Sequence, residues 1–173
     1  MASYVVVDPD VLFQVLPGSP RRAKDAPHDP AYFDKYGYLV AGETRATIAL
    51  SSKREGKAEN PYDVDLTFRL LVSSSDSIAA KVFAQEWEQT QKFTPSIQLV
   101  DTSAANTAQE SRIWRTSLEP GSADCIAQVR YGNYVLRFVG RIEQGGYFES
   151  ERQFLDMVRV LDAQIPSLLK QAT

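Results

Sequence analysis

The side chains best suited to bind a ligand in this sequence belong to five residues, four arginines and one tryptophan, which are spread over three strand-like segments. Arg130, Arg137 and Arg141 share one face of a predicted hairpin, because side chains alternate along a strand. Trp114 and Arg115 lie in an earlier segment and together could frame a pocket. Guanidinium groups suit anionic ligands and acidic partners. We therefore predict these five as ligand-binding residues.

A structural interpretation of the same residues stays open. Arg69 shares the polar face of a nearby strand, and Asp63, Asp65 and Asp124 could neutralise the arginines across strands. In that case the arginines would form a basic surface that these carboxylates neutralise, and Trp114 would belong to the core.

The search for catalytic and metal-binding groups predicts none. His28 lies alone in a proline-rich segment, and Cys125 lies on the apolar face of the hairpin, where buried thiols are inert. One histidine and one cysteine cannot supply a metal site. Asp63 and Asp65 could serve a hydrolase, but they fit better as the wet side of a strand. We predict a non-enzymatic protein without cofactors.

Composition narrows the class of protein. The 173 residues suit a single domain, and 43% hydrophobic with 24% charged residues is ordinary for globular proteins. The net charge of −3 gives no basic excess for nucleic acid, and no run of 18 apolar residues predicts a membrane span.

The first residues do not resemble a signal peptide, since they lack a basic region and a long apolar run. The chain is therefore expected to be either cytoplasmic or the mature domain of an exported protein with an added start. Met1-Ala2-Ser3 reads the same for a native and an added start.

Two regions are expected along the chain. Residues 1–30 form an N-terminal segment, with a helical turn after Asp8-Pro9 and an irregular proline-rich arm over 17–30. Residues 31–173 form a single α+β domain. Strands are predicted over 44–52, 62–72, 97–100 and 110–119, with a helix over 77–92 and a loop over 101–109.

The hairpin around Gly132-Asn133 can be predicted in register. A two-residue turn there places Tyr131 opposite Tyr134 and Ala127 opposite Phe138 on an apolar face. The other face pairs Arg130 with Val135, Gln128 with Arg137, and Asp124 with Arg141. The apolar pattern and the turn agree, which fixes the register.

A final helix should follow a capping box, with Ser150 as the N-cap and Gln153 reaching back. Its apolar stripe runs from Phe154 to Ile165 and should cover the apolar face of the sheet, and Pro166 should end or kink it. The predicted fold is an antiparallel sheet packed by two main helices, with a possible ββα-type internal duplication.

Three motifs carry a resemblance to a known family. They are Tyr36-Gly37-Tyr38, the segment from Ala108 to Arg115, and Val129-Arg130-Tyr131-Gly132-Asn133-Tyr134-Val135. Over residues 31–170 their order is similar to that of bacterial extracytoplasmic lipoproteins and sensor-like domains of unknown function. The element order also resembles the PsbP-like and Mog1-like sandwich. The resemblance implies export and a binding or accessory role, while the missing lipobox cysteine departs from the pattern.

The sequence leads to three hypotheses of function. The first is a binding or accessory module, an exported sensor-like domain that recognises a small ligand or a protein partner. The second is a structural subunit of a larger assembly, with the arm over 17–30 lying on a neighbour. The third is a hydrolase that uses Asp63 and Asp65.

Overall fold

A computed structural model describes residues 21–25, 32–33, 39–49, 66–94 and 96–171. These residues form an eight-stranded antiparallel sheet in the order β1-β3-β4-β8-β7-β6-β5, with β2 paired to β3. The strands are β1 (Arg21–Asp25), β2 (Tyr32–Phe33), β3 (Leu39–Ala49), β4 (Leu66–Ser73), β5 (Ile97–Leu99), β6 (Glu110–Glu119), β7 (Ser122–Tyr131) and β8 (Tyr134–Glu143). The helices are α2 (Asp76–Phe93), η1 (Thr102–Ala105, a 3-10 turn) and α3 (Glu151–Gln171).

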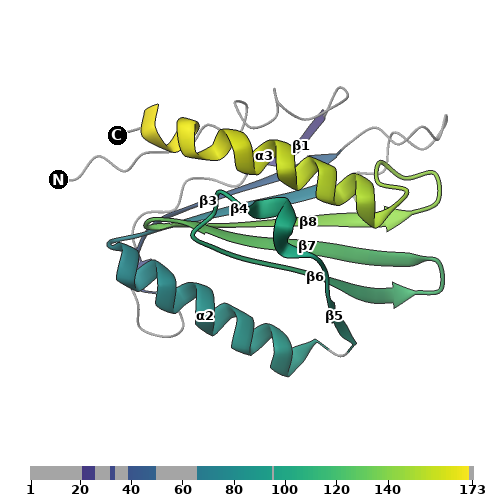
Figure 1. The fold of residues 1–173 in the computed structure, drawn as a ribbon, viewed down its shortest axis with the longest axis horizontal. Coiled ribbons are helices and arrows are strands. Elements are labelled where there is room, and N and C mark those ends of the chain that lie inside the picture. The colour runs from purple at the N-terminus through teal and green to yellow at the C-terminus, as the bar shows by residue number, and fades with distance from the viewer. Residues whose placement is uncertain (1–20, 26–31, 34–38, 50–65, 95, 172–173) are drawn as a thin grey trace.

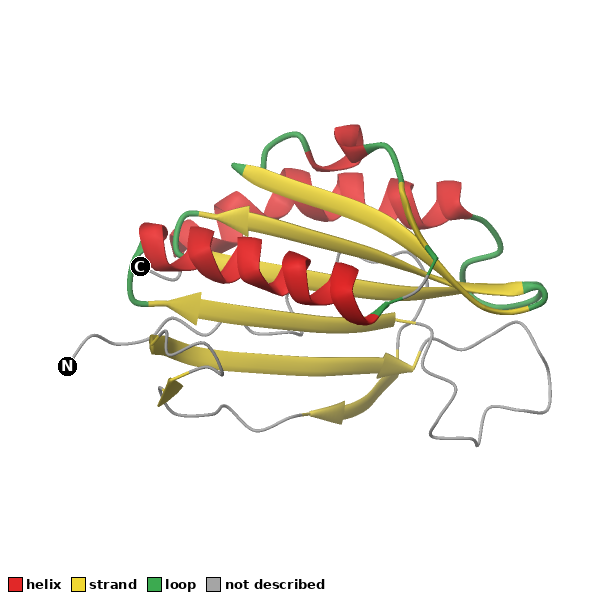
Figure 2. Cartoon of the chain, turned by 90° about the horizontal axis from the view of Figure 1, so that it is seen from below, coloured by secondary structure: helices red, strands yellow, loops and turns green. Residues whose placement is uncertain are grey.

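The two long helices lie on opposite sides of the sheet (Figures 1 and 2). Helix α3 covers the apolar face, as the sequence predicts. Its Phe154, Val158 and Ile165 join Leu136 and Phe138 of β8 in the larger of two buried clusters. The α+β architecture, with an antiparallel sheet and two main helices, is thus confirmed.

The register of the β7–β8 hairpin is also confirmed. Tyr131 pairs with Tyr134 and Ala127 with Phe138, while Gln128 lies across from Arg137. Gly132 in the turn has a φ of 56°, the conformation that such a two-residue turn requires. This register decides which side chains face α2 and which face α3.

The sheet face that the sequence predicts to be exposed to solvent is partly covered. Helix α2 packs on it, and Val82 and Phe83 bury Leu71 of β4 and Val135 of β8 in a second, smaller cluster. Leu71 interrupts the polar side of its strand in the sequence, and it is the residue over which the helix docks. Ser75 caps α2 by accepting a hydrogen bond of 3.2 Å from the backbone N–H of Ile78.

The expectation of an irregular arm over 17–30 is wrong for residues 21–25, which form strand β1 and pair with β3. The prolines at 17, 20, 27 and 30 flank this stretch without entering it, so an edge strand fits between them. A bulge interrupts the pairing between Arg22 and Lys24. The loop predicted over 101–109 likewise contains η1, whose Ala104 and Ala105 are buried.

Of the two outcomes expected at Pro166, an end of the helix does not occur, because α3 continues through the proline to Gln171. Proline lacks the N–H that would bond the carbonyl of Asp162, four residues earlier. The hydroxyl of Thr107 donates to that carbonyl instead, over 2.7 Å. At the other end, the N–H of Gln153 donates to the Ser150 hydroxyl over 3.4 Å, and the Gln153 side chain accepts from the Glu149 N–H.

Several predictions fall outside the described residues: the turn after Asp8-Pro9, His28, and the pair Asp63 and Asp65. Within the described part, no helix combines the length and the apolar character needed to cross a membrane. The internal duplication stays a prediction; β4 and β8 pair through Phe68 and Phe138, but the helices that follow them cover opposite faces.

Candidate functional site

The structure divides the five predicted ligand-binding residues between the two faces of the sheet. Arg130, Arg137 and Arg141 share the α2 face, and Trp114 joins them through its register partner Ile126. Arg115 is next to Trp114 in the chain, so it points to the α3 face, across from Cys125. The expected pocket framed by Trp114 and Arg115 together is therefore not formed.

Arg130 ties α2 to the sheet. Its guanidinium forms ion pairs with Glu110 on β6 and Asp76 in the first turn of α2. It also donates to the side-chain oxygen of Gln109 over 3.0 Å and to the carbonyl of Gly132 over 3.1 Å. A buried arginine with this many partners has its donors engaged in holding the fold.

Two other arginines on this face have acidic partners. Arg141 lies 3.6 Å from Asp124, the cross-strand neutralisation that the sequence suggests. Arg69 of β4, directly across from Arg137, donates over 2.9 Å to Glu86 on α2. The second oxygen of Glu86 accepts from Gln128 over 2.8 Å. Glu86 therefore bridges β4 and β7 beneath the helix.

Arg137 and Arg112 lie among aromatic rings under α2. Arg137 is 5.5 Å from the ring centre of Trp114, and Trp114 makes an edge contact with Trp87 at 5.1 Å. Arg112 lies 4.6 Å from the ring of Phe83. Burial lowers the pKa of both guanidinium groups, although nearby carboxylates oppose the effect. This cluster packs the helix on the sheet.

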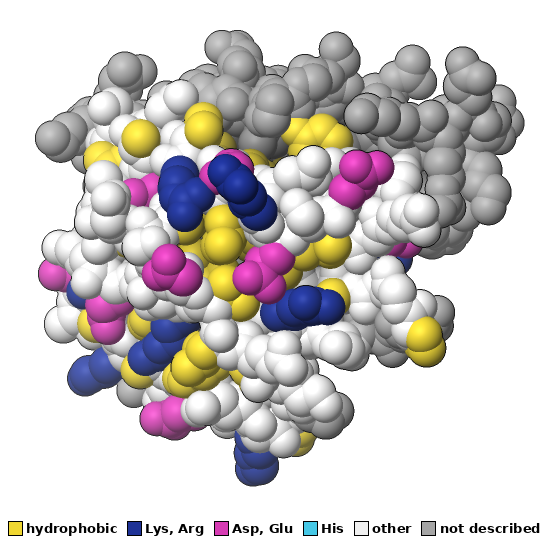
Figure 3. Space-filling model, turned by 45° about the vertical axis from the view of Figure 1, so that its right-hand side comes forward, with side chains coloured by type: hydrophobic (Ala, Val, Ile, Leu, Met, Phe, Trp, Pro, Cys, Tyr) yellow, Lys and Arg dark blue, Asp and Glu magenta, His cyan; other side chains and the backbone are white. Residues whose placement is uncertain are grey.

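Charges of both signs are mixed on the face of the molecule shown in Figure 3, where basic and acidic side chains surround apolar patches. The local basic surface expected from the arginines is thus largely balanced by acidic neighbours: Asp76, Glu86, Glu110 and Asp124.

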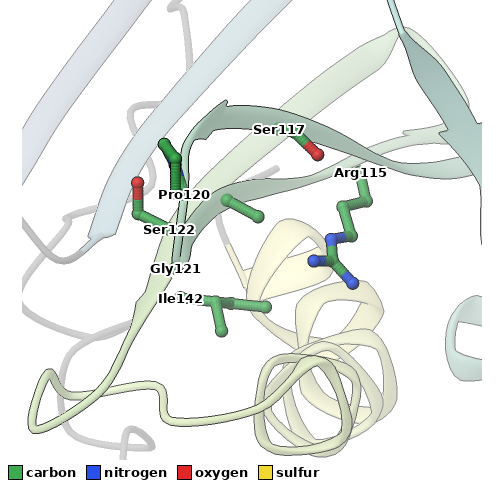
Figure 4. A pocket seen from close by; sticks show the side chains of 7 residues that line it. Arg115, Ser117, Pro120, Gly121, Ser122 and Ile142 are labelled. Carbon is green, nitrogen blue, oxygen red and sulfur yellow. The ribbon is translucent and has the colours of Figure 1, made fainter.

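Arg115 is different, because it borders an open pocket on the α3 side. The cavity has a volume of about 510 Å³ and lies at the end of the sheet formed by the β6–β7 hairpin. Figure 4 shows the guanidinium of Arg115 extending from β6 across this space, with the side chain of Ile142 from β8 on the other side. Ser117, Pro120, Ser122 and Ala123 complete the wall around the turn at Gly121.

No acidic group within the described residues forms an ion pair with Arg115, and its buried Nε has no hydrogen-bond partner there. Three charged side chains act on the thiol of Cys125, namely Glu151, Arg115 and Asp124. Burial, with a contribution from Glu151, raises the pKa of Cys125 to about 12, and Arg115 acts in the opposite direction. Because Arg115 has no ion pair and no partner for its Nε among the described residues, its guanidinium can still bind an anion.

The described residues that line the pocket offer few groups that could catalyse a reaction. Among the described residues that line it, Arg115 alone is ionisable, so neither serine has a neighbouring base there to activate it. In the part of the chain that the structure describes, no three His, Cys, Asp or Glu side chains gather as a metal site needs. The arrangement suits binding.

The sequence identified Arg115 but not the residues around it. Ser117, Ala123 and Ile142 form one row across β6, β7 and β8, since Ser117 pairs with Ala123 and Ala123 with Ile142. The registers of the two hairpins place these three residues side by side. The row could therefore be predicted by extending the Gly132-Asn133 register to β6. The sequence gives no signal for Glu86, because a glutamate in a helix is usually exposed to solvent.

Comparison with protein-family models, with curated proteins and with solved structures found no match to this chain.

Proposed function

We propose that this protein is a non-enzymatic binding module and that the Arg115 pocket accepts a small anionic ligand. The observation that carries the proposal is the state of Arg115. Its guanidinium points into an open cavity, and its buried Nε has no partner among the described residues. Partial burial of an unpaired guanidinium is unfavourable, and a bound anion would remove that cost.

The contrast with the other arginines supports this choice of site. Arg130, Arg141 and Arg69 each contact a carboxylate, so binding an external anion there would first require breaking an existing pair. Among the residues that the structure describes, no carboxylate forms such a pair with Arg115. Arg137 also has a buried Nε without a hydrogen-bond partner among the described residues, but its guanidinium lies against the Trp114 ring under α2, whereas that of Arg115 faces the cavity. We therefore place ligand binding at Arg115 and a structural role at the arginines of the α2 face.

Binding of simple anions to the purified protein tests the proposal. We expect acetate, citrate or inorganic phosphate at millimolar concentration to raise the thermal unfolding midpoint and to give saturable heats in calorimetry. Arg115→Gln should weaken binding of the effective anion at least tenfold, as the loss of a charge-assisted hydrogen bond implies. The matched control is Arg152→Gln, which removes the same charge from a 90% exposed side chain at the start of α3.

Equal binding by the parent protein and Arg115→Gln would overturn the proposal. The absence of any saturable anion binding to the folded parent protein would overturn it as well.

We also retain the resemblance to extracytoplasmic sensor-like domains, and with it an exported location, as a proposal. A cytoplasmic location is the alternative. Fractionation of the native host with an antibody against this domain distinguishes them, because an exported protein appears outside the cytoplasmic fraction.

A further inference from the structure

The walls of the Arg115 pocket differ in character from one side to the other. The cation comes from β6, whereas Pro120, Ala123 and Ile142 give the opposite side an apolar surface. The single hydroxyl in line with this row is that of Ser117, which lies beside Arg115 in Figure 4, and the Ser122 hydroxyl points away from it. The polar groups therefore gather at one end of the cavity.

An inorganic anion would satisfy only that polar end. A cavity of about 510 Å³ is far larger than one carboxylate or phosphate, so water would remain against Pro120 and Ile142. A hydrocarbon group there would release this water, and each buried methylene contributes about 0.8 kcal/mol.

We infer that the ligand is a monocarboxylate with a short aliphatic body; this inference rests on the proposed function of the same pocket. The carboxylate binds the guanidinium of Arg115, with Ser117 as a further donor. The aliphatic body lies over Ala123 against Pro120 and Ile142.

The turn at Gly121 leaves room for the far end of such a ligand. A side-chain carbon added at Gly121 would have no atom of a described residue within 4 Å, which leaves space beside the turn. Affinity should therefore rise with chain length while the pocket fills and then level off, as further methylenes extend into solvent.

A series of straight-chain acids from acetate to octanoate, titrated by calorimetry, tests the inference. We expect affinity to rise about three- to fourfold for each of the first added methylenes, the factor that corresponds to burying one methylene. Hexanol, which keeps the chain but lacks the carboxylate, should bind at least tenfold more weakly than hexanoate. Ile142→Ser should flatten the dependence on chain length, because it removes the apolar wall against which the aliphatic body packs.

Two outcomes separate this inference from the proposed function. If acetate or phosphate binds in an Arg115-dependent way but affinity does not change with chain length, the aliphatic ligand is wrong and the anion pocket stands. If neither the acids nor phosphate bind in an Arg115-dependent way, both fail. A chain-length dependence that Arg115→Gln and Ile142→Ser leave unchanged also overturns the inference, because the acids then bind elsewhere.

Discussion

The hydroxyl of Thr107 donates a 2.7 Å hydrogen bond to the backbone carbonyl of Asp162, 55 residues further along the chain. That carbonyl would bond the N–H of residue 166 in an uninterrupted helix, but residue 166 is proline. The loop before β6 thus supplies the donor that the proline lacks. This contact explains how α3 runs through Pro166 while the carbonyl stays satisfied.

The coupling between these two residues is testable by a double-mutant cycle. Thr107→Val keeps the branched shape and removes the donor, and we expect it to lower the free energy of unfolding by about 1–2 kcal/mol. In a Pro166→Ala background the new N–H can bond the carbonyl itself, so the same change should cost less than half as much. Urea unfolding measures all four proteins. Equal costs in both backgrounds would show that the hydroxyl does not substitute for the helix bond.

The carboxylate of Asp162 provides a second link at the same place. It is buried, and its oxygens accept from the Thr107 N–H at 2.8 Å, from the Ala108 N–H at 3.2 Å and from the hydroxyl of Tyr131. The loop, β7 and α3 therefore meet at one side chain. Burial is the main reason that the pKa of Tyr131 is raised, with the hydrogen bond to Asp162 next.

Removing the Tyr131 hydroxyl should destabilise the protein through this link. Tyr131→Phe leaves one oxygen of a buried carboxylate with a single, longer hydrogen bond, and we expect a loss of roughly 1–3 kcal/mol in unfolding free energy. The matched control is Tyr134→Phe, directly across the hairpin and only half-buried, for which we expect less than 1 kcal/mol. Similar losses in the two variants would assign the effect to the hairpin rather than to Asp162.

The sequence predicts most of the framework but not this kind of contact. The register of β7 and β8 follows from a local turn and a period-two pattern, so Tyr131 and Arg137 could be assigned to opposite faces in advance. The bonds from Thr107 to Asp162 join distant segments, and no local pattern encodes them. From the local sequence alone, Pro166 is expected to end or kink the helix.

In the candidate site, too, the local arrangement is predictable from the sequence and the contacts between distant segments are not. Alternation assigns Arg130, Arg137 and Arg141 to one face, and the structure agrees. The sequence could not show that α2 would bring Asp76 and Glu86 onto that face, because the docking of a helix is a tertiary event. Trp114 and Arg115 are adjacent in the sequence, but neighbours on a strand point in opposite directions, so they do not frame one pocket.

Glu86 should be the principal polar anchor of α2. Glu86→Gln leaves Arg69 and the partly buried Arg137 without their nearest carboxylate on the helix, and we expect a loss of about 2–4 kcal/mol in unfolding free energy. Glu88→Gln, an exposed change two residues later, is the control and should cost less than 0.5 kcal/mol. Hydrogen exchange locates the effect: backbone amides of α2 should lose protection in Glu86→Gln while those of α3 keep theirs. Uniform loss in both helices would argue against a local anchor.

Cys125 should make the protein less stable in alkali. Burial raises the pKa of its thiol to about 12 in the folded state, above the roughly 8.5 of an unfolded chain. Below pH 8 the thiol is protonated in both states and contributes no pH dependence. From about pH 9 the unfolded chain loses this proton and the folded protein keeps it, so stability should fall by about 1.4 kcal/mol per pH unit. Tyr131, whose pKa is also raised, adds to the decline above about pH 10.

Chemical unfolding of the parent and of Cys125→Ala between pH 7 and 10 isolates the thiol contribution. The difference in unfolding free energy between the two proteins should be constant up to about pH 8 and then shrink as pH rises, since only the parent carries the thiol. Alkylation gives an independent measurement. Iodoacetamide at pH 8 should modify the folded protein far more slowly than the urea-unfolded chain, because the folded thiol is buried and protonated. Rapid alkylation of the folded protein, or a difference that stays constant to pH 10, would show that the thiol ionises readily in the folded state.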